Sequence, residues 1–260
     1  MCRIRILLAV SLVSVFVLAG ASQVQAISVA YITGTTEPWS QQGNVNALNA
    51  VFGSGGWTRY DWSNAGGVLA PGAYQMIFAD GGDAQTLPFE AFVNTNRTAL
   101  EAWVAGGGSL ILEAARWDDS SPFNLGFGGT LNYSASSTAS APNPAHPVIN
   151  GPFGNTGTSF WGSYFSHDYI TGAGFTTILT GNGNATLVEK DWGSGHVILS
   201  GLTLPFSQHP SWSPNTWTLH QNLLDYAADE VAVIPEPVTM AGLTFALMGL
   251  GAYARRRRTA

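Results

Sequence analysis

Short apolar runs that alternate with helical patterns constrain the fold of this sequence more than any other feature. Runs that fit buried strands occupy residues 27–32, 75–79 and 109–112. Helical patterns fill the intervals, at 45–52 and at 98–104, and glycines that end a helix follow each of them. Because parallel strands need a long crossover between them, usually a helix, this order predicts an α/β domain with a parallel sheet and helices on both faces.

The second half of the sequence departs from this alternation. Residues 120–145 are rich in Ser, Asn, Ala and Pro and show no sustained periodicity, which predicts a long loop. Apolar runs at 176–179, 185–189 and 196–200 predict strands, and the last two are close enough to form a hairpin. A final helix is predicted to begin at an N-cap, Ser213, that is followed by a proline.

Three segments resemble class I glutamine amidotransferase-like domains, especially those of the trehalose-utilisation type. They are the helix-glycine-strand unit at 100–112, the segment 146–149 and the late strand at 195–201. The resemblance extends over residues 28–229. It implies a three-layer, flavodoxin-like arrangement, in which helices cover both faces of a parallel sheet.

Two positions separate this chain from the working members of that superfamily. Those members carry a cysteine on the turn after the third strand, but the turn here is Glu113-Ala114-Ala115. They also place an acid two residues after a late histidine, whereas His209 is followed by Pro and Ser. The only cysteine is Cys2. Cysteine-dependent amide hydrolysis is therefore excluded, and we predict no catalytic residue and no cofactor.

The N-terminal residues have the three parts of a secretory signal peptide. Arg3 and Arg5 are basic, residues 6–20 are apolar, and Val24-Gln25-Ala26 is a small-residue cleavage site. We therefore predict that a signal peptidase removes residues 1–26. The mature chain would then begin with a single domain.

The C-terminal residues form another three-part pattern. A Pro-Glu-Pro triplet at 235–237 precedes 17 uncharged residues at 238–254, and four arginines follow directly. As a helix, the uncharged segment would span about 25 Å, the short limit for crossing a bilayer. The pattern resembles the PEP-CTERM sorting signal over residues 235–260. In that family exosortase, a membrane protease-transpeptidase, recognises the triplet and removes the tail.

This resemblance implies a route for the protein. Arginines resist transfer across a membrane, so the chain upstream of them is expected on the other side. The body at 27–234 would be exported across the inner membrane, anchored transiently through 238–254, and released to the cell surface or the extracellular space. A lasting tail anchor is the alternative. The sorting residues are Pro235, Glu236, Pro237, Arg255, Arg256, Arg257 and Arg258.

The charge of the body excludes some classes of partner. Residues 27–234 contain four basic and 15 acidic side chains, which gives a net charge of −11. So few basic groups cannot neutralise many phosphates, which disfavours nucleic-acid binding, and we predict no nucleic-acid partner. Anionic membrane surfaces are disfavoured for the same reason. An exopolysaccharide remains a candidate partner.

Candidate ligand-binding residues follow from the predicted sheet. Ligands of open α/β sheets bind beyond the carboxyl ends of the strands, which indicates 33–39, 80–83 and 113–119. Aspartates beside glycines also close turns through their own backbone, and an Arg-Asp pair also forms on plain surfaces, so both readings stay open. Exposed tryptophan rings can stack on sugars. The candidates are Asp80, Asp83, Glu113, Arg116, Trp117, Asp118 and Trp161.

A metal site is not predicted. The five histidines share no tight ligand spacing with each other or with acids, and His167 and Asp168 face opposite ways if they lie on a strand. The body also lacks a Gly-x-Ser-x-Gly elbow, which leaves a serine hydrolase weakly supported.

Three hypotheses remain for the body. The first is a non-catalytic domain of the cell surface or extracellular matrix that binds carbohydrate. The second is an extracellular hydrolase of glycans or esters that uses carboxylates such as Asp80, Glu113 or Asp118, which must lie roughly 5 to 9.5 Å apart across a glycosidic bond. The third is a purely structural matrix protein.

Overall fold

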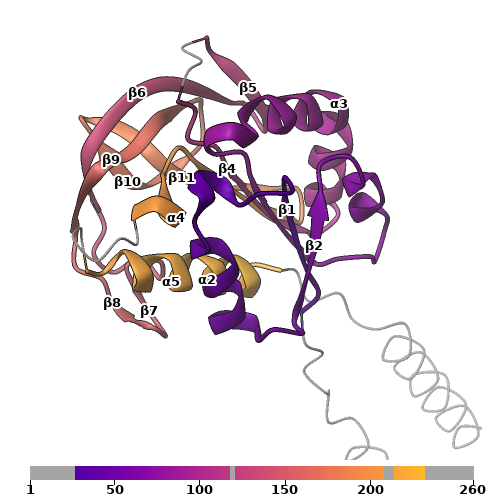
Figure 1. The fold of residues 1–260 in the computed structure, drawn as a ribbon, viewed down its shortest axis with the longest axis horizontal. Helices are drawn as coiled ribbons and strands as arrows, with labels where there is room; N and C mark the ends of the chain where they lie inside the picture. The colour runs from indigo at the N-terminus through magenta and orange to yellow at the C-terminus, as the bar shows by residue number, and fades with distance from the viewer. Residues whose placement is uncertain (1–26, 118–120, 208–213, 232–260) are drawn as a thin grey trace, which may run out of the picture. The chain divides into compact units, whose positions relative to one another are not determined.

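A mixed sheet of ten strands forms the centre of the structure (Figure 1). The computed structural model describes residues 27–117, 121–207 and 214–231, which belong to one compact unit. The strands are β1 (Val29–Thr33), β2 (Trp57–Asp61), β3 (Met76–Asp80), β4 (Ser109–Glu113), β5 (Phe123–Gly126), β6 (Gly129–Ser140), β7 (Asn150–Gly151), β8 (Gly154–Asn155), β9 (Ser159–Thr171), β10 (Thr176–Gly181), β11 (Asn184–Trp192) and β12 (Gly195–Ser200). The helices are α2 (Gly43–Phe52), α3 (Thr86–Ala105), α4 (Leu204–Ser207) and α5 (Thr216–Asp229), with short 3-10 turns η1 (Pro38–Ser40), η2 (Ala65–Leu69) and η3 (Asp83–Gln85).

Five parallel strands make up one half of the sheet. Their order is β2-β1-β3-β4-β12, and α2 and α3 are the crossovers from β1 to β2 and from β3 to β4. The strands and helices predicted for 27–112 are confirmed, but α3 already begins at Thr86. Phe89, Phe92 and Val93 extend its buried stripe towards the N-terminus, so the capping pattern at Thr98 lies inside the helix.

Antiparallel strands make up the other half, and they show that the predicted fold class is wrong. β12 pairs antiparallel with β11. The further pairs, β11 with β10, β10 with β6, and β6 with both β5 and β9, are antiparallel as well. The described sheet is therefore mixed, and the expected flavodoxin-like, amidotransferase-like parallel sheet does not describe it. The predicted hairpin of 185–189 and 196–200 is confirmed as β11 and β12.

The loop predicted at 120–145 is also wrong, because β5 and the whole of the 12-residue β6 lie there. β6 contains Ser, Thr, Asn and Ala rather than large apolar residues, and most of its positions are exposed or half-buried. An antiparallel strand can leave one face in water, so its sequence signal is weaker than that of a buried parallel strand. The pairing of β6 with β9 holds this segment in the sheet.

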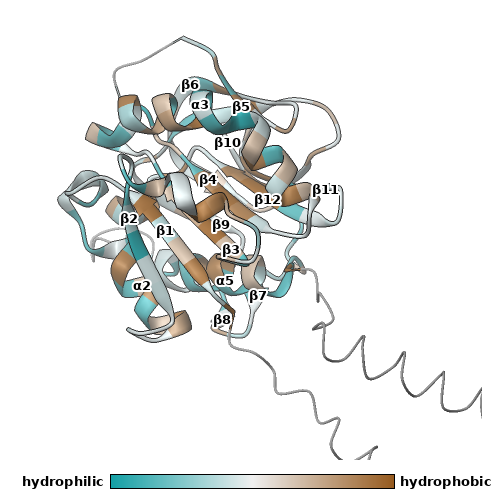
Figure 2. Ribbon diagram, turned by 90° about the vertical axis from the view of Figure 1, so that its right-hand side faces the viewer, coloured by the Kyte–Doolittle hydropathy of each residue, from teal (hydrophilic) through white to brown (hydrophobic). Residues whose placement is uncertain are grey.

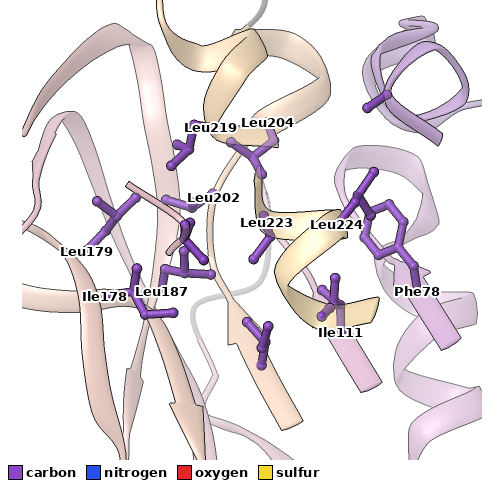
Figure 3. Close-up of a cluster of buried hydrophobic side chains, with 14 of the residues drawn as sticks. Phe78, Ile111, Ile178, Leu179, Leu187, Leu202, Leu204, Leu219, Leu223 and Leu224 are labelled. Atoms are coloured by element: carbon purple, nitrogen blue, oxygen red, sulfur yellow. The ribbon is translucent and has the colours of Figure 1, made fainter. Parts of the chain in front are cut away.

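Helices cover both faces of the parallel half (Figure 1). On one face, α2 and α5 pack against alternate residues of the sheet, and Figure 3 shows Leu223 and Leu224 of α5 beside Phe78 and Ile111. On the other face, α3 packs against the intervening residues, such as Leu110. Apolar residues are concentrated in the central strands (Figure 2), and burial on both faces explains the continuous apolar runs of these strands.

The final helix begins at Thr216, with Asn215 as its N-cap residue. The predicted N-cap, Ser213, lies outside the described residues. Within the described ranges, no helix is long and apolar enough to cross a membrane. The predicted signal peptide, sorting signal and membrane segment at 238–254 all lie outside those ranges.

A close backbone approach at Gly195 gives a first test of the fold. A Cβ atom at this position would collide with the carbonyl oxygens of Val104 and Gly108, neither of which is a flexible group. We expect Gly195→Ala to lower the free energy of unfolding by about 1–3 kcal/mol, because β12 must move away from the end of α3. Gly66→Ala is the matched control, since nothing lies within 4 Å of its Cβ position. Urea unfolding would measure both, and equal stability of the two variants would contradict this packing.

Candidate functional site

A cavity of about 210 Å³ lies where the parallel strands end, and aromatic side chains form most of its wall. Four of its residues follow the carboxyl ends of β1, β3, β4 and β12, and the other three come from β9. This is the location where open α/β sheets bind ligands. The residues of this aromatic cavity are Trp39, Asp83, Trp117, Ser163, Tyr164, His167 and Phe206.

His167 is at the centre of the aromatic wall. Its ring centroid lies 4.7 Å from that of Trp117, 5.1 Å from that of Trp39 and 5.6 Å from that of Tyr164. Burial lowers the pKa of His167 to about 4, so the imidazole is neutral near pH 7. Its Nδ1 lies 3.2 Å from the carbonyl oxygen of Arg116. A neutral ring can pair there only by donating from Nδ1, which leaves Nε2 as an acceptor.

Three residues of the cavity wall have an unusual backbone conformation. The φ angles of Trp39, Asp83 and Tyr164 are 59°, 55° and 58°, in the left-handed region that side chains with a Cβ avoid. Each such residue costs of the order of 1–3 kcal/mol and persists only where the surroundings enforce it. Strain of this kind concentrates at binding and catalytic sites, and here it positions three side chains around one cavity.

A buried ion pair fixes the turn after β4. Arg116 is fully buried, and its Nη2 and Nε lie 2.8 and 3.0 Å from Oδ1 of Asp168 in β9. The backbone N–H of Arg116 also donates to Oδ2 of Asp168, at 2.6 Å. Asp168 is fully buried, whereas the neighbouring His167 lines the cavity. Arg116 is therefore occupied by the protein and does not line the cavity.

Two carboxyl groups lie side by side behind the cavity. Asp80 and Glu113 are register neighbours at the ends of β3 and β4, and each is 1% exposed. Asp80 accepts from Asn44 Nδ2 at 2.6 Å and from the Gly82 N–H at 2.8 Å, and Glu113 accepts from Ser200 Oγ at 2.9 Å. Burial raises the pKa of Asp80 to about 7, and burial together with Asp80 raises the pKa of Glu113 well above its usual range. The pair thus retains a proton near neutral pH.

Asn44 connects this pair to the segment that carries Trp39. Its Nδ2 donates to Asp80 and also to the Tyr31 hydroxyl at 2.8 Å. Tyr31 in turn donates to Glu37 Oε2 at 2.7 Å, and Arg59 forms an ion pair with the other oxygen of Glu37 at 2.6 Å. Since Glu37 directly precedes η1, this chain of contacts holds the strained Trp39 in place.

The structure separates the predicted site residues into four groups. Asp83 and Trp117 line the aromatic cavity, with Trp117 51% exposed. Asp80, Glu113 and Arg116 are buried behind it, and Asp118 lies outside the described residues. Trp161 is 50% exposed and lines a different hollow of about 350 Å³, with Thr138 and Asn182 among its other residues.

Sequence reasoning missed five residues of the cavity, which are Trp39, Ser163, Tyr164, His167 and Phe206. Trp39 lay within the predicted region 33–39, but no feature of the sequence distinguished it as a wall residue. Tyr164, His167 and Phe206 could not be placed, because their position depends on how β9 and α4 pack against the parallel half. The one available signal was the dense run of aromatic residues at 160–167.

The cavity contains no group of ligands suited to a metal ion. Within the described ranges, one set of three or more such side chains comes together, and it is formed by Asp191, His196 and Glu230 at the other end of β12.

Comparisons with known proteins identify no family. No family model and no curated protein matches the sequence. The exo-β-1,4-mannosidase of Opitutaceae bacterium strain TAV5 is 14% identical, with a TM-score of 0.49, over 80% of this chain and 36% of that one. The β-galactosidase of Rahnella sp. R3 is 13% identical, with a TM-score of 0.48, over 85% of this chain and 33% of that one.

A cytoplasmic protein of Salmonella typhimurium is 15% identical, with a TM-score of 0.47, over 77% of this chain and 98% of that one. The chain thus spans about a third of the length of the two enzymes and nearly all of the third protein. Similarities of this strength assign neither a family nor an activity.

The protonated pair predicts how stability depends on pH. The folded pKa of Asp80 is about 7, whereas an unfolded aspartate has a pKa of about 4, so the folded state keeps a proton that the unfolded state has released. The contribution of Asp80 to the free energy of unfolding is fully present below about pH 4. It is lost as the pH rises to about 7, by at most about 1.4 kcal/mol per pH unit. Asp80→Asn should flatten this part of the curve in urea titrations. Parallel curves for the two proteins would contradict the raised pKa.

Proposed function

We propose that this chain is an exported protein whose body binds carbohydrate in the aromatic cavity without cleaving it. The observation that carries the proposal is the wall of flat rings around His167. Trp39 and Trp117 meet at 80°, and Trp117 and Tyr164 meet at 89°, so the rings present faces in different directions. Aromatic faces combined with a few polar groups are typical of sites that take amphipathic ligands such as sugars.

The cavity suits one sugar unit. Its volume of about 210 Å³ is below the roughly 300–1,000 Å³ of sites for drug-sized ligands. The exposed ring of Trp117 offers a stacking surface for the apolar face of a sugar. Asp83 and Ser163 offer hydrogen-bonding groups, and a neutral His167 offers an acceptor. We therefore propose that the site binds a terminal or branching unit of a polysaccharide.

The charges around the cavity set its preference. Its lining contains the carboxylate of Asp83 and no lysine or arginine, and Arg116 is held by Asp168. A negatively charged sugar would lose hydration without gaining a cation. Neutral and amino sugars should therefore bind better than uronic acids.

A glycan or ester hydrolase is the second candidate, and the shared proton of Asp80 and Glu113 favours it, because a general acid needs a raised pKa. The placement of these groups favours binding instead. Neither Asp80 nor Glu113 lines the cavity, and Asp83 is the one carboxylate among its described residues. Two acids on opposite sides of a substrate are thus not provided by the described residues.

Two equally exposed tryptophans provide the test of this proposal. Trp117→Ala should weaken binding of neutral oligosaccharides by about tenfold, because a stacked ring contributes roughly 0.5–1.5 kcal/mol beyond its buried area. Trp161→Ala removes a ring of the same exposure outside the cavity, and should change affinity less than twofold. A glycan array followed by calorimetry would measure both, with the protein kept in a detergent that contains no sugar.

The other outcomes are also informative. If Trp161→Ala alone abolishes binding, the carbohydrate site is the other hollow and the proposal is wrong. Complete absence of binding would leave the purely structural matrix role. If new reducing ends form and Asp80→Asn stops their release, the hydrolase is the correct function.

Export and release complete the proposed function. We infer that signal peptidase removes residues 1–26 and that exosortase cuts at Pro235, Glu236 and Pro237, while Arg255 to Arg258 stay on the cytoplasmic side. Support comes from the order of basic, apolar and cleavage parts at one end and of triplet, apolar segment and arginines at the other. Anchoring would be transient, and the body would act at the cell surface or in the extracellular matrix.

Mass spectrometry of the protein from its native cells tests this route. Mature molecules should begin at Ile27 and lack the segment 238–254. Replacing Pro235 and Pro237 by alanine should leave the tail attached, with the N-terminus still processed. Full-length termini on the mature protein, or its recovery from the cytosol, would exclude the proposed route.

A further inference from the structure

A second group of potential ligands lies at the end of β12 opposite the aromatic cavity. Asp191 in β11, His196 at the start of β12 and Glu230 after α5 each place one ligand atom within 4.8 Å of the other two. The carbohydrate proposal uses none of these residues. From this group and its surroundings, we propose that the protein binds a divalent transition-metal ion here, through one imidazole and two carboxylates.

The β11-β12 hairpin brings the first two ligands together. Asp191 and His196 are cross-strand partners, so their side chains lie on the same face, with Asp191 Oδ1 2.9 Å from His196 Nδ1. Lys190 lies between Glu189 and Asp191 in the strand and points to the opposite face, where its Nζ donates to the carbonyl oxygens of Phe127 and Ala173. The nearest lysine therefore does not neutralise the group.

A carboxylate stands behind the histidine, in the position that orients a metal ligand. Oε2 of Glu189 lies 3.4 Å from His196 Nε2, and its Oε1 lies 3.1 Å from His146 Nε2. Both Oε2 of Glu189 and Nε2 of His196 are buried, and neither has a hydrogen-bond partner among the described residues. A metal at Nδ1 requires the proton on Nε2, and after a small rotation of the ring this N–H would donate a hydrogen bond to Oε2 of Glu189.

The end of α5 adds a second reason for a cation. Asp225, Asp229 and Glu230 lie in or directly after the last turns of this helix, and its last turn contains no basic residue. A helix C-terminus already carries about half a negative charge, which favours cations and disfavours acids. A bound divalent ion would offset this concentration of negative charge.

The ligand types indicate which ions fit. Imidazole together with carboxylate suits zinc, manganese and similar ions, whereas calcium and magnesium prefer oxygen alone. The side chain of Asp191 is 88% exposed, so water can reach the ion and complete its coordination. The site is therefore open on one side.

Calorimetry with the untagged full-length chain in a sugar-free detergent tests the proposal. Zinc should bind with a stoichiometry of one, and magnesium should not compete. Asp191→Asn and Glu230→Gln should each weaken zinc binding at least tenfold. Glu189→Gln should weaken it by about 10–100-fold, as is typical for a residue that orients a ligand. Asp229→Asn removes a charge from the same helix end but no ligand, and should weaken zinc binding by no more than about fivefold.

Two results would overturn the proposal. One is the absence of saturable binding of both zinc and manganese to the wild-type protein. The other is equal affinity of Asp191→Asn and the wild type, since a change at this exposed side chain leaves the fold intact and circular dichroism can verify that. Cobalt provides a further readout, because its visible spectrum should change on loss of the His196 nitrogen in His196→Asn. Carbohydrate binding should be the same in all these variants, so the two proposals fail separately.

Discussion

The buried ion pair between Arg116 and Asp168 joins the two halves of the sheet, and the candidate site depends on it. Arg116 follows β4 in the parallel half, and Asp168 belongs to β9 in the antiparallel half. Three hydrogen bonds between them connect one backbone N–H and two guanidinium nitrogens of Arg116 to the carboxylate of Asp168. Breaking such a pair on one side would leave an uncompensated charge in the interior, which is strongly unfavourable. The relative position of the two halves is thereby fixed.

This fixed position is what creates the aromatic cavity. The carbonyl of Arg116 holds the ring of His167, and the next residue, Trp117, packs against that ring. On the other side, the contacts of Asn44 and Tyr31 hold the segment of Trp39. Trp39 and Tyr164 have strained φ angles, and this conformation places both rings at the cavity. The surrounding polar contacts hold the backbone of these residues in that conformation.

The parallel half was predictable because the sequence pattern of each strand and helix reflects how that element is buried. Residues buried on both faces form continuous apolar runs, and the rule on the carboxyl ends of strands led to Asp83 and Trp117. The same rule identified Asp80 and Glu113, but it could not show that both are buried. Residue type indicates chemistry, whereas accessibility depends on what packs above the sheet.

Within the antiparallel half, the hairpin of β11 and β12 was predictable, but β5, β6 and β9 were not, for a related reason. β6 is held by its pairing with β9, and a polar strand with one wet face looks like a loop in the sequence. The position of His167 follows from that pairing, and the cross-strand contact of Asp191 with His196 follows in the same way from the pairing of β11 with β12. Residues that meet because two strands pair have no fixed spacing in the sequence, so sequence patterns do not reveal these contacts.

The origin of the cavity in two halves has a consequence for how such a protein can diversify. Trp39, Asp83 and Trp117 stand on turns of the parallel half, while Ser163, Tyr164 and His167 all come from one stretch of β9. Exchanging that stretch while Asp168 is retained would alter the shape and polarity of one wall and leave the opposite wall untouched. Substitutions in this stretch of β9 could therefore change which ligand the cavity prefers, while the turns of the parallel half and the buried core stay as they are.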